Sequence, residues 1–242
     1  MQRIIDPVRQ GRYGTLFLEL VVVVLGILLA LGFDQWRQER EEAVLETEYL
    51  LALRADLNED LRIFDERIFP EIEMRLKVSA HLRSFTPGNV PETLQEQRAF
   101  VDSISMAGYM NTFNPRRIAM DDMLATGNLR LISNKQLRFT LLEYYDSIEK
   151  WQPYDDWARK LIWENFRNEF TGFIPLDAVH MSAEGRSATP RDSFVEIVNN
   201  ETFQRGLLNV RFMAGWQQQR YEAIYEEANE LVNAIEEEIP TS

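Results

Sequence analysis

The sequence contains no cysteine, and it has few basic residues, because 26 Lys and Arg stand against 39 Asp and Glu. Without cysteine there is no disulfide, no thiolate metal ligand and no cysteine nucleophile. The net charge of −13 repels the phosphates of nucleic acids, which argues against binding to DNA or RNA. The fold must therefore be held by its hydrophobic core, for which 14 Phe, 8 Tyr and 5 Trp supply large side chains.

Catalytic motifs are also missing. The two histidines, His81 and His180, stand far apart in the sequence, and neither belongs to an HExxH or ExxH pattern. There is no GxSxG elbow, P-loop or GxGxxG motif. Asp121 and Asp122 form an acidic pair, but Arg117 lies four residues before Asp121 and predicts a surface ion pair. We therefore predict no catalytic residue, metal or cofactor, and an enzyme ranks third among the function classes.

One long apolar run is present near the N-terminus, at residues 15–33, TLFLELVVVVLGILLALGF. At 1.5 Å rise per residue a helix of this length covers roughly 28 Å, close to the hydrocarbon thickness of a bilayer. The run has one charged residue, Glu19, and no proline. We predict a transmembrane helix over residues 15–33, a short cytoplasmic tail over 1–14 and a periplasmic domain over 34–242.

The orientation is predicted from the charges that flank the run. Three basic residues precede it and two follow it, namely Arg3, Arg9, Arg12, Arg37 and Arg40. The positive-inside rule then places the N-terminus in the cytoplasm. In a Gram-negative bacterium this puts the helix in the inner membrane and most of the chain in the periplasm.

A cleaved signal peptide is the alternative interpretation, with Ala30-Leu31-Gly32 as a small-x-small cleavage site. Two observations count against it. Glu19 would interrupt the apolar core of the signal, and polar helix-forming sequence begins directly after Phe33. We favour the uncleaved anchor.

Three residues of the run are candidate contacts with a partner helix. Glu19 pairs with a partner or relays protons if it lies within the bilayer, or it reaches back to water near the cytoplasmic interface. Gly26 and Ala30 have small-xxx-small spacing, which permits close helix approach. The lipid bilayer and a homo-oligomer or another membrane protein are the expected partners.

The chain outside the membrane is predicted to be all-α, an elongated antiparallel bundle on two long helices at about 34–69 and 200–238. Leucines and other apolar residues recur every three or four positions in both. In the first, Asp56 and Asp60 are placed on the charged outer face. Pro70 should kink or restart that helix. The buried stripe of the second is predicted as Leu207, Val210, Ala214, Tyr221, Ile224, Ala228, Leu231 and Ile235.

Shorter helices are predicted between the two long ones. A capping box at Thr93-x-x-Glu96 opens a helix to about Ala107. A short helix over 116–125 ends at Gly127, and Ser133 or Asn134 caps the next. The inner face of that helix is predicted as Leu137, Leu141, Tyr144 or Tyr145, and Ile148. Pro153 should break it, with the pattern resuming at Tyr154, Trp157, Leu161, Phe166 and Phe170 up to Gly172. A loop is predicted over 173–192.

An aromatic cluster around Pro153 is the one candidate ligand or partner face, formed by Trp151, Tyr154, Trp157 and Trp163. These rings could line a pocket for a small molecule or form a protein-binding surface. Aromatic residues at helical spacing are more often part of the core, and a core position is the favoured interpretation here.

Two stretches carry a resemblance: ELVVVVLGILLALGFDQW followed by EYLLALRADLNEDL, and MDDMLATGNLRLISNKQLRFTLLEYYDSI. They resemble a family of uncharacterised bacterial proteins with one N-terminal membrane helix and a helical extramembrane domain. The family's membrane run opens with a Glu, here Glu19, and closes near a Trp, here Trp36. The second motif matches at Thr126, Gly127, Leu129, Leu131, Ile132, Asn134 and Leu137. The family often has Asn before the Trp, where this chain has Asp34 and Gln35. The resemblance covers residues 1–60 and 115–150 and implies the topology, with no chemistry.

These observations predict a binding or scaffold subunit of a membrane complex or homo-oligomer. The alternative is a periplasmic small-molecule sensor or accessory signalling subunit that uses an aromatic pocket between helices.

Overall fold

The computed structural model describes residues 12–162 and 190–240. Its elements are α1 (Arg12–Ile63), the π-helical turn η1 (Phe64–Ile68), α2 (Phe69–Arg83), α3 (Leu94–Ala107), α4 (Ile118–Thr126), the 3₁₀ turn η2 (Asn128–Leu131), α5 (Lys135–Ile162), α8 (Arg191–Asn199) and α9 (Glu201–Glu238). Within those two ranges the only β-type pairing is an isolated bridge between Thr86 and Asn89. The predicted all-α class is therefore confirmed.

The first three elements form one continuous helical rod from Arg12 to Arg83, roughly 110 Å long at 1.5 Å per residue. Pro70 lies in the first turn of α2, where its missing N–H and fixed φ are tolerated best. The π-helical turn directly before it is closed by the Phe69 N–H, which donates to the Phe64 carbonyl. The expected restart of the helix at Pro70 is thus observed, without a break in the rod.

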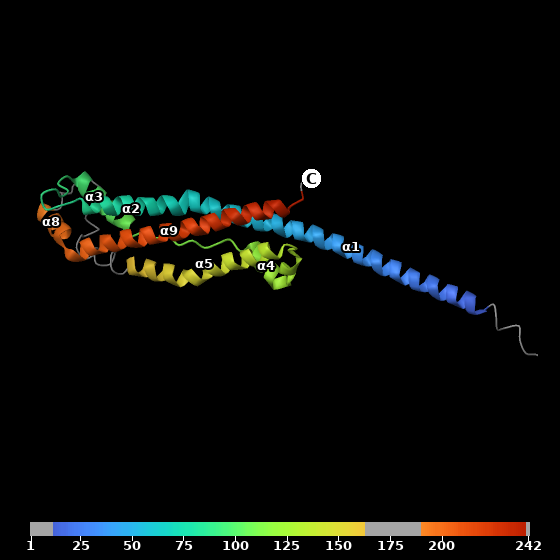
Figure 1. Ribbon diagram of the computed structural model, residues 1–242. Coiled ribbons are helices and arrows are strands. Elements are labelled where there is room, and N and C mark those ends of the chain that lie inside the picture. The colour runs from blue at the N-terminus through green and yellow to red at the C-terminus, as the bar shows by residue number, and fades with distance from the viewer. Residues whose placement is uncertain (1–11, 163–189, 241–242) are drawn as a thin grey trace, which may run out of the picture.

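Helix α9 runs antiparallel to the rod, as predicted (Figure 1). Three contacts set the register, namely Arg54 with Glu236, Asp65 with Tyr225, and Arg75 with Gln217. Through these three pairs the residue numbers rise along the rod and fall along α9. The C-terminal end of α9 therefore returns to the middle of the rod. Asn200 starts α9 by accepting hydrogen bonds from the N–H groups of Thr202 and Phe203. All eight predicted residues of its stripe are buried.

The local signals for helix ends are confirmed by their geometry. Thr93 and Glu96 form the capping box that opens α3. Gly127 ends α4 with φ of 73°, in the left-handed region that favours glycine. The side chain of Asn134 caps α5 by accepting from the N–H groups of Gln136 and Leu137.

Two predictions for the region after residue 150 are wrong. Pro153 does not break α5, which continues to Ile162. Pro153 is exposed on the helix surface. Helix α8 begins at Arg191, inside the predicted loop, and it packs on α9. Phe166, Phe170 and Gly172 lie outside the described residues.

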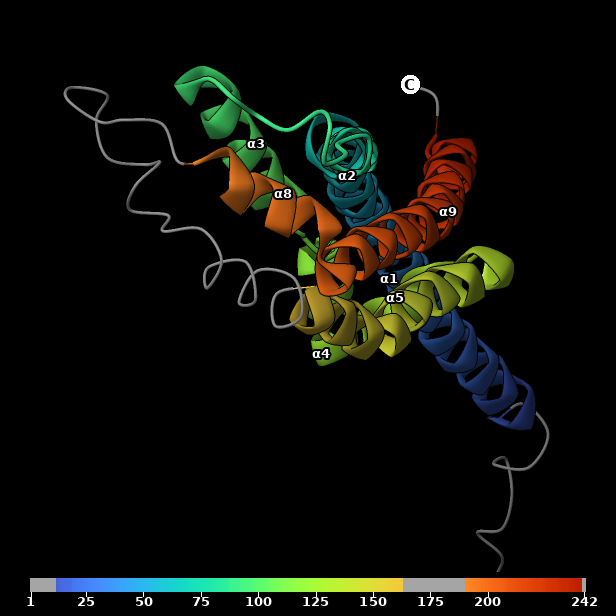
Figure 2. The same ribbon diagram turned by 90° about the vertical axis from the view of Figure 1, so that its left-hand side faces the viewer.

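The core consists of two hydrophobic clusters along the bundle. One joins α1, η1, the start of α2, α4, α5 and the C-terminal half of α9. The other joins the end of α2, α3, the end of α5, α8 and the N-terminal half of α9. Seen from the end in Figure 2, α3 and α8 cover the tip of the bundle farthest from the start of α1.

Candidate functional sites

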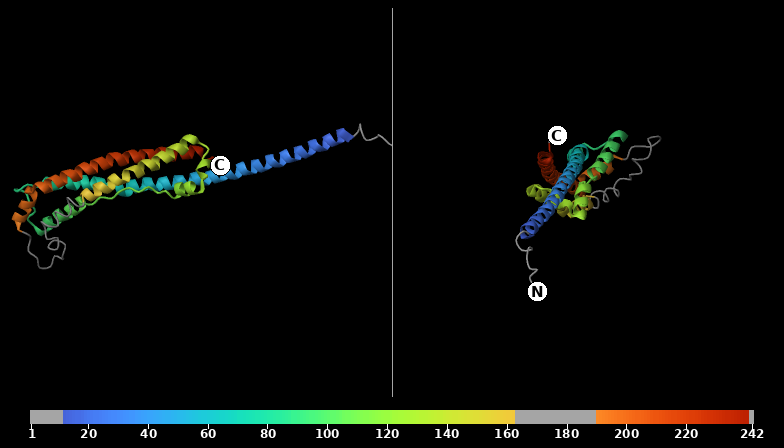
Figure 3. Two further views of the ribbon diagram at one scale, coloured as in Figure 1. Left: turned by 90° about the horizontal axis from the view of Figure 1, so that it is seen from below. Right: turned by 90° about the vertical axis from the view of Figure 1, so that its right-hand side faces the viewer.

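The N-terminal part of α1 projects from the bundle as a single helix with no described element beside it (Figure 3). An 18-residue window of this part has a mean hydropathy of 2.4, and none of that window is buried. By length and composition α1 can cross a membrane. Large apolar side chains exposed here include Phe17, Leu20, Val23, Leu25, Leu28, Leu29 and Phe33. Soluble proteins rarely expose an apolar surface of this extent.

The three candidate membrane-helix contacts lie along one face of this segment. Gly26 follows Glu19 by seven residues and Ala30 follows Gly26 by four, which is helical spacing. All three are exposed, and a Cβ placed on Gly26 would meet no heavy atom within 4 Å. The single chain therefore leaves this face open.

The core interpretation of the aromatic cluster is wrong. Trp151, Tyr154 and Trp157 are 40%, 54% and 56% exposed. The buried stripe of α5 passes instead through Asp155, Ala158 and Ile162, one residue out of phase with the aromatic positions. Trp163 lies outside the described residues.

Trp151 contacts the neighbouring ring of Tyr154 and two residues of α9, Trp216 and Arg220. The ring of Trp151 lies 4.9 Å from that of Tyr154 and 5.9 Å from that of Trp216, measured between centroids. The guanidinium of Arg220 lies 4.4 Å from the centroid of Trp151, a cation–π contact. Burial lowers the pKa of Arg220. The structure thus adds Trp216 and Arg220 to the predicted face.

A second feature was missed by sequence reasoning: side chains of the helices hold the non-helical segment 109–117 against the bundle, with Met110 and Phe113 buried and Tyr109, Asn114 and Arg116 exposed. Figure 1 shows this segment as the green trace that leads from α3 to α4. Backbone N–H and C=O groups away from water need partners, and here no helix or sheet provides them. Four helices supply these partners through Asp60 of α1, Glu71 of α2, Tyr145 of α5, and Gln217 and Tyr221 of α9.

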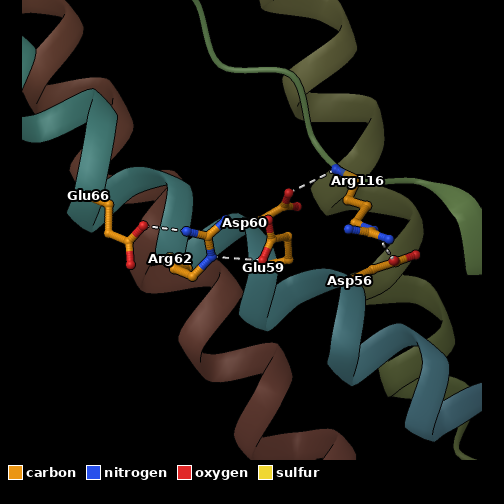
Figure 4. A network of polar contacts seen from close by, with 6 residues as sticks. All are labelled: Asp56, Glu59, Asp60, Arg62, Glu66 and Arg116. Atoms are coloured by element: carbon orange, nitrogen blue, oxygen red, sulfur yellow. Dashed lines mark hydrogen bonds and ion pairs between the residues drawn. The ribbon is translucent and has the colours of Figure 1, made fainter.

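Two carboxylates of α1 hold the end of this segment and the start of α4 (Figure 4). The N–H of Arg116 donates to Oδ1 of Asp60 at 2.8 Å, and its Nε lies 3.0 Å from Oδ1 of Asp56. The N–H of Ala119 donates to Oδ2 of Asp56 at 2.9 Å. Arg117, at the N-cap position of α4, makes no side-chain cap, so Asp56 caps α4 from another helix. Both aspartates are buried, which corrects their predicted place on the outer face.

Asp60 is the most perturbed carboxyl of this group. Burial raises the pKa of Asp60 to about 7, and the negative charges of Asp56 and Glu59 act in the same direction. The hydrogen bond from the Arg116 N–H opposes the shift. Its second oxygen, Oδ2, is buried without a hydrogen bond.

A polar layer separates the two hydrophobic clusters. Arg75 is fully buried, and one of its terminal nitrogens donates to Oε1 of Gln217. Nε2 of Gln217 in turn donates to the carbonyl of Asn111 at 2.9 Å. The Tyr221 hydroxyl donates to Oδ2 of Asp155 and accepts from the Phe113 N–H, each at 2.9 Å. Burial lowers the pKa of Arg75.

These polar groups hold the fold together and do not form a recognisable reaction centre. In residues 12–162 and 190–240, no three His, Asp or Glu side chains are placed to hold a metal ion. The predicted ion pair of Arg117 with Asp121 is present, with Nε and Oδ1 3.2 Å apart. His81 is exposed, as expected, and His180 lies outside the described residues.

Comparison of the chain with protein-family models, with curated proteins and with solved structures found no match.

Proposed function

We propose that this chain is a single-pass membrane protein whose helical domain acts as a binding or scaffold subunit of a membrane complex or homo-oligomer. One observation carries the proposal: the apolar segment of α1 is fully exposed and extends away from the bundle. Burying such a segment in lipid or against a partner helix removes its apolar surface from water, at about 25 cal/mol per Å².

We propose further that the protein is bacterial, with its N-terminus in the cytoplasm and the bundle in the periplasm. The basic residues before the apolar run support this orientation. So does the resemblance to single-pass bacterial membrane proteins at Glu19, Trp36 and Gly127.

Membrane fractionation of the full chain tests the anchor. Each charge at the centre of a membrane helix opposes insertion by about 3 kcal/mol. We therefore expect the wild-type protein to resist carbonate extraction and the double variant Val24→Arg, Leu25→Arg to be released. Val44→Arg is the control, because Val44 is exposed on α1 beyond the apolar run. Release of the wild-type protein, or an intact mass that starts near Phe33, would support the signal peptide instead.

Single cysteines test the orientation, because the chain has none of its own. In intact spheroplasts, a membrane-impermeant maleimide should label Gln95→Cys, in the exposed part of α3, and spare Gln10→Cys. The reverse labelling would invert the topology.

Association through α1 is tested by crosslinking in mild detergent. A larger side chain at Gly26 should block close helix approach, so Gly26→Leu should lose the oligomer. Gly32→Leu is the matched control, because six residues of helix place Gly32 away from the face of Gly26 and Ala30. A wild-type protein that runs strictly as a monomer would contradict the oligomer.

The alternative function, a small-molecule sensor, requires a pocket between helices. The exposure of Trp151, Tyr154 and Trp157 favours a protein-binding surface instead. A metabolite screen by thermal shift checks this: a shift that Trp157→Ala abolishes would favour the sensor.

A further inference from the structure

A cluster of aromatic and basic side chains lies at the end of the apolar run of α1. Positions three, four and seven residues after Phe33 lie on the same side of a helix, and here they hold Trp36, Arg37 and Arg40. We name these four residues the boundary cluster. Phe33 is 63% exposed and Trp36 is 53% exposed, and both arginines are exposed too. They belong to the part of α1 that projects from the bundle, so no other described part of the chain covers them (Figure 3).

The side chains of the boundary cluster contact each other. The ring centroids of Phe33 and Trp36 are 5.8 Å apart. The guanidinium carbon of Arg40 lies 5.8 Å from the centroid of the Trp36 ring, which is a cation–π contact. Helical side chains lean toward the N-terminus of their helix, which here is the direction of the apolar run. Arg40 therefore reaches back by one turn, toward the end of that run.

The charges of this stretch are separated by their position around the helix. Residues 34–42 also contain four acidic residues, namely Asp34, Glu39, Glu41 and Glu42, so the stretch as a whole is not basic. At roughly 100° per residue, each of the four lies about 70° or more around the helix from the midpoint of the two arginines. Glu39 and Glu42 accept hydrogen bonds from Gln35 and Gln38 on their own sides. One side of α1 thus carries two neighbouring guanidinium groups without a carboxylate between them.

The apolar run fixes where this cluster lies relative to a bilayer, because α1 is one unbroken helix from Arg12 to Ile63. At 1.5 Å per residue, Trp36 lies roughly 4.5 Å and Arg40 roughly 10 Å beyond Phe33, while the headgroup layer on each side of a bilayer is about 5 to 8 Å thick. Because the arginine side chains lean back toward the run, their guanidinium groups come to the level of the lipid phosphates. Trp is enriched at this level in membrane proteins.

The surface beside the cluster has room for a headgroup. An open hollow of about 590 Å³ begins at Trp36 and is lined by both arginines and Glu41. The planar guanidinium group is suited to binding two phosphate oxygens at once. Arg37 pairs with Glu41 at 3.5 Å in an exposed contact, and pairs of this kind contribute little.

We infer that the boundary cluster is a binding site for a phospholipid headgroup, in which Arg37 and Arg40 bind the phosphate and the Trp36 ring packs beside the ester groups. This inference rests on the membrane anchor proposed above and names what this part of α1 binds. Glu41 lies farther from the run than either ring and suits the ammonium group of a zwitterionic headgroup, which extends outward from its phosphate. Headgroups surround α1 at this height in either orientation of the chain, so the ligand is present in both leaflets.

The site would set the height of the bundle above the membrane. Interfacial Trp and Arg residues fix the depth and rotation of a membrane helix. Along α1, Glu46 makes the first hydrogen bond to a distant part of the described chain, from Ser133. Glu46 lies ten residues after Trp36, so the base of the bundle stands roughly 15 Å beyond the headgroup site.

Lipid retention by the full chain in detergent tests the site. The chain is mixed with phosphatidylethanolamine or with diacylglycerol of the same acyl chains, and native mass spectrometry counts the bound lipids. We expect roughly tenfold more adduct with the phospholipid, and loss of this preference in Arg37→Gln with Arg40→Gln. Arg62→Gln is the control, because Arg62 is exposed on the same helix and pairs with Glu59 and Glu66. Equal retention of both lipids by the wild-type protein, or an unchanged preference in the double variant, would overturn the inference.

The depth of α1 gives a second measurement, in vesicles of phosphatidylcholine. Nitroxide labels on single cysteines are compared by their access to oxygen and to a water-soluble nickel chelate. Gly32→Cys should report hydrocarbon, Gln35→Cys the headgroup layer and Glu42→Cys water. Trp36→Ala with Arg40→Ala should move the Gln35 label by about 3 Å or more, two residues of helix, and Val44→Ala should not. A Gln35 label in open water or in hydrocarbon, or an unchanged depth in the double variant, contradicts the site.

The two proposals fail separately. If the anchor is wrong, carbonate releases the wild-type protein and the labels at all three positions report water. If the site alone is wrong, the chain stays in the membrane fraction, but neither the phospholipid preference nor the depth of the Gln35 label depends on Trp36 and the arginines.

Discussion

Asn111 binds both carboxylate oxygens of Glu71. Its backbone N–H donates to Oε1 and its side-chain amide to Oε2, each at 2.7 Å. Glu71 belongs to the helical rod, whereas Asn111 lies in segment 109–117. This contact ties the segment to the rod beside the buried Arg75, at the boundary between the two hydrophobic clusters.

Removing this carboxylate should destabilise the fold. In Glu71→Ala two donors of Asn111 lose their partner and Arg75 loses a nearby negative charge, so we expect a loss of about 2 to 3 kcal/mol. Thermal and urea unfolding of the detergent-solubilised chain, followed by circular dichroism, measures it. The matched control is Glu73→Ala, because Glu73 forms only an exposed pair with Lys77. Equal effects of the two changes would contradict a structural role for the Glu71–Asn111 contact.

Removing the hydroxyl of Tyr221 should also destabilise the fold. Tyr221→Phe leaves the Phe113 N–H and one oxygen of Asp155 without partners in a buried place, which should cost about 2 to 3 kcal/mol. Tyr225→Phe removes one exposed hydrogen bond to Asp65 and should change stability by less than about 0.5 kcal/mol. Unfolding curves of both variants show the difference. A Tyr221→Phe protein as stable as wild type would mean that water replaces the hydroxyl.

The stability of the protein should fall as the pH rises from about 4 to 7. The pKa of Asp60 is raised to about 7 in the folded chain from an ordinary 3.8, so the folded state binds its proton more tightly than the unfolded state. Protonation therefore stabilises the fold, and this contribution is lost through pH 7. Asp60→Asn keeps an acceptor for the Arg116 N–H without the charge. We expect this variant to be more stable than wild type at pH 8, by on the order of 2 kcal/mol, and nearly equal at pH 4.

Unfolding measured at several pH values between 4 and 8 checks this expectation. Burial also raises the pKa of Asp155, so Asp60→Asn should reduce the slope without abolishing it. Asp121→Asn, at an exposed carboxyl, is the control and should leave the slope unchanged. A wild-type protein that gains stability between pH 5 and 8 would contradict the prediction.

Two glycines should respond to alanine with opposite signs. Gly127 has φ of 73°, where a Cβ is strained, so Gly127→Ala should lose about 1 kcal/mol. Gly215 lies inside α9, and a Cβ placed there meets no heavy atom within 4 Å. Gly215→Ala should therefore gain about 0.5 to 1 kcal/mol from helix propensity. Thermal unfolding checks both predictions: the midpoint of Gly127→Ala should lie below that of wild type, and the midpoint of Gly215→Ala should lie above it.

Helix ends and apolar stripes could be predicted because their signals lie within one or two turns of sequence. The capping box of Thr93 and Glu96, the turn at Gly127 and the cap at Asn134 each depend on neighbouring residues alone. The apolar stripe of α9 repeats over about eight turns, so the sequence indicates clearly which side of the helix is buried.

The exposure of Trp151, Tyr154 and Trp157 could not be predicted correctly, because Pro153 was expected to break the helix. Since α5 continues, the buried phase passes through Asp155 and Ala158, and the rings face outward. Asp56 and Asp60 were misplaced for a related reason. Their charge suggested water, but the N–H groups that bind them come from Arg116, at the end of segment 109–117, and from Ala119, in the first turn of α4, more than fifty residues later.

The sequence by itself determined the helical class, the apolar segment of α1, the helix ends that carry a local cap signal and the antiparallel pairing of the two long helices, because each depends on local spacing or length. Only the tertiary structure decided which polar side chains are buried. Which polar side chains are buried depends on where segment 109–117 lies in the fold. Its backbone N–H and C=O groups have no helix or sheet partners, and side chains from four helices bind them. It also decided that Trp151, Tyr154 and Trp157 lie on the surface of the bundle.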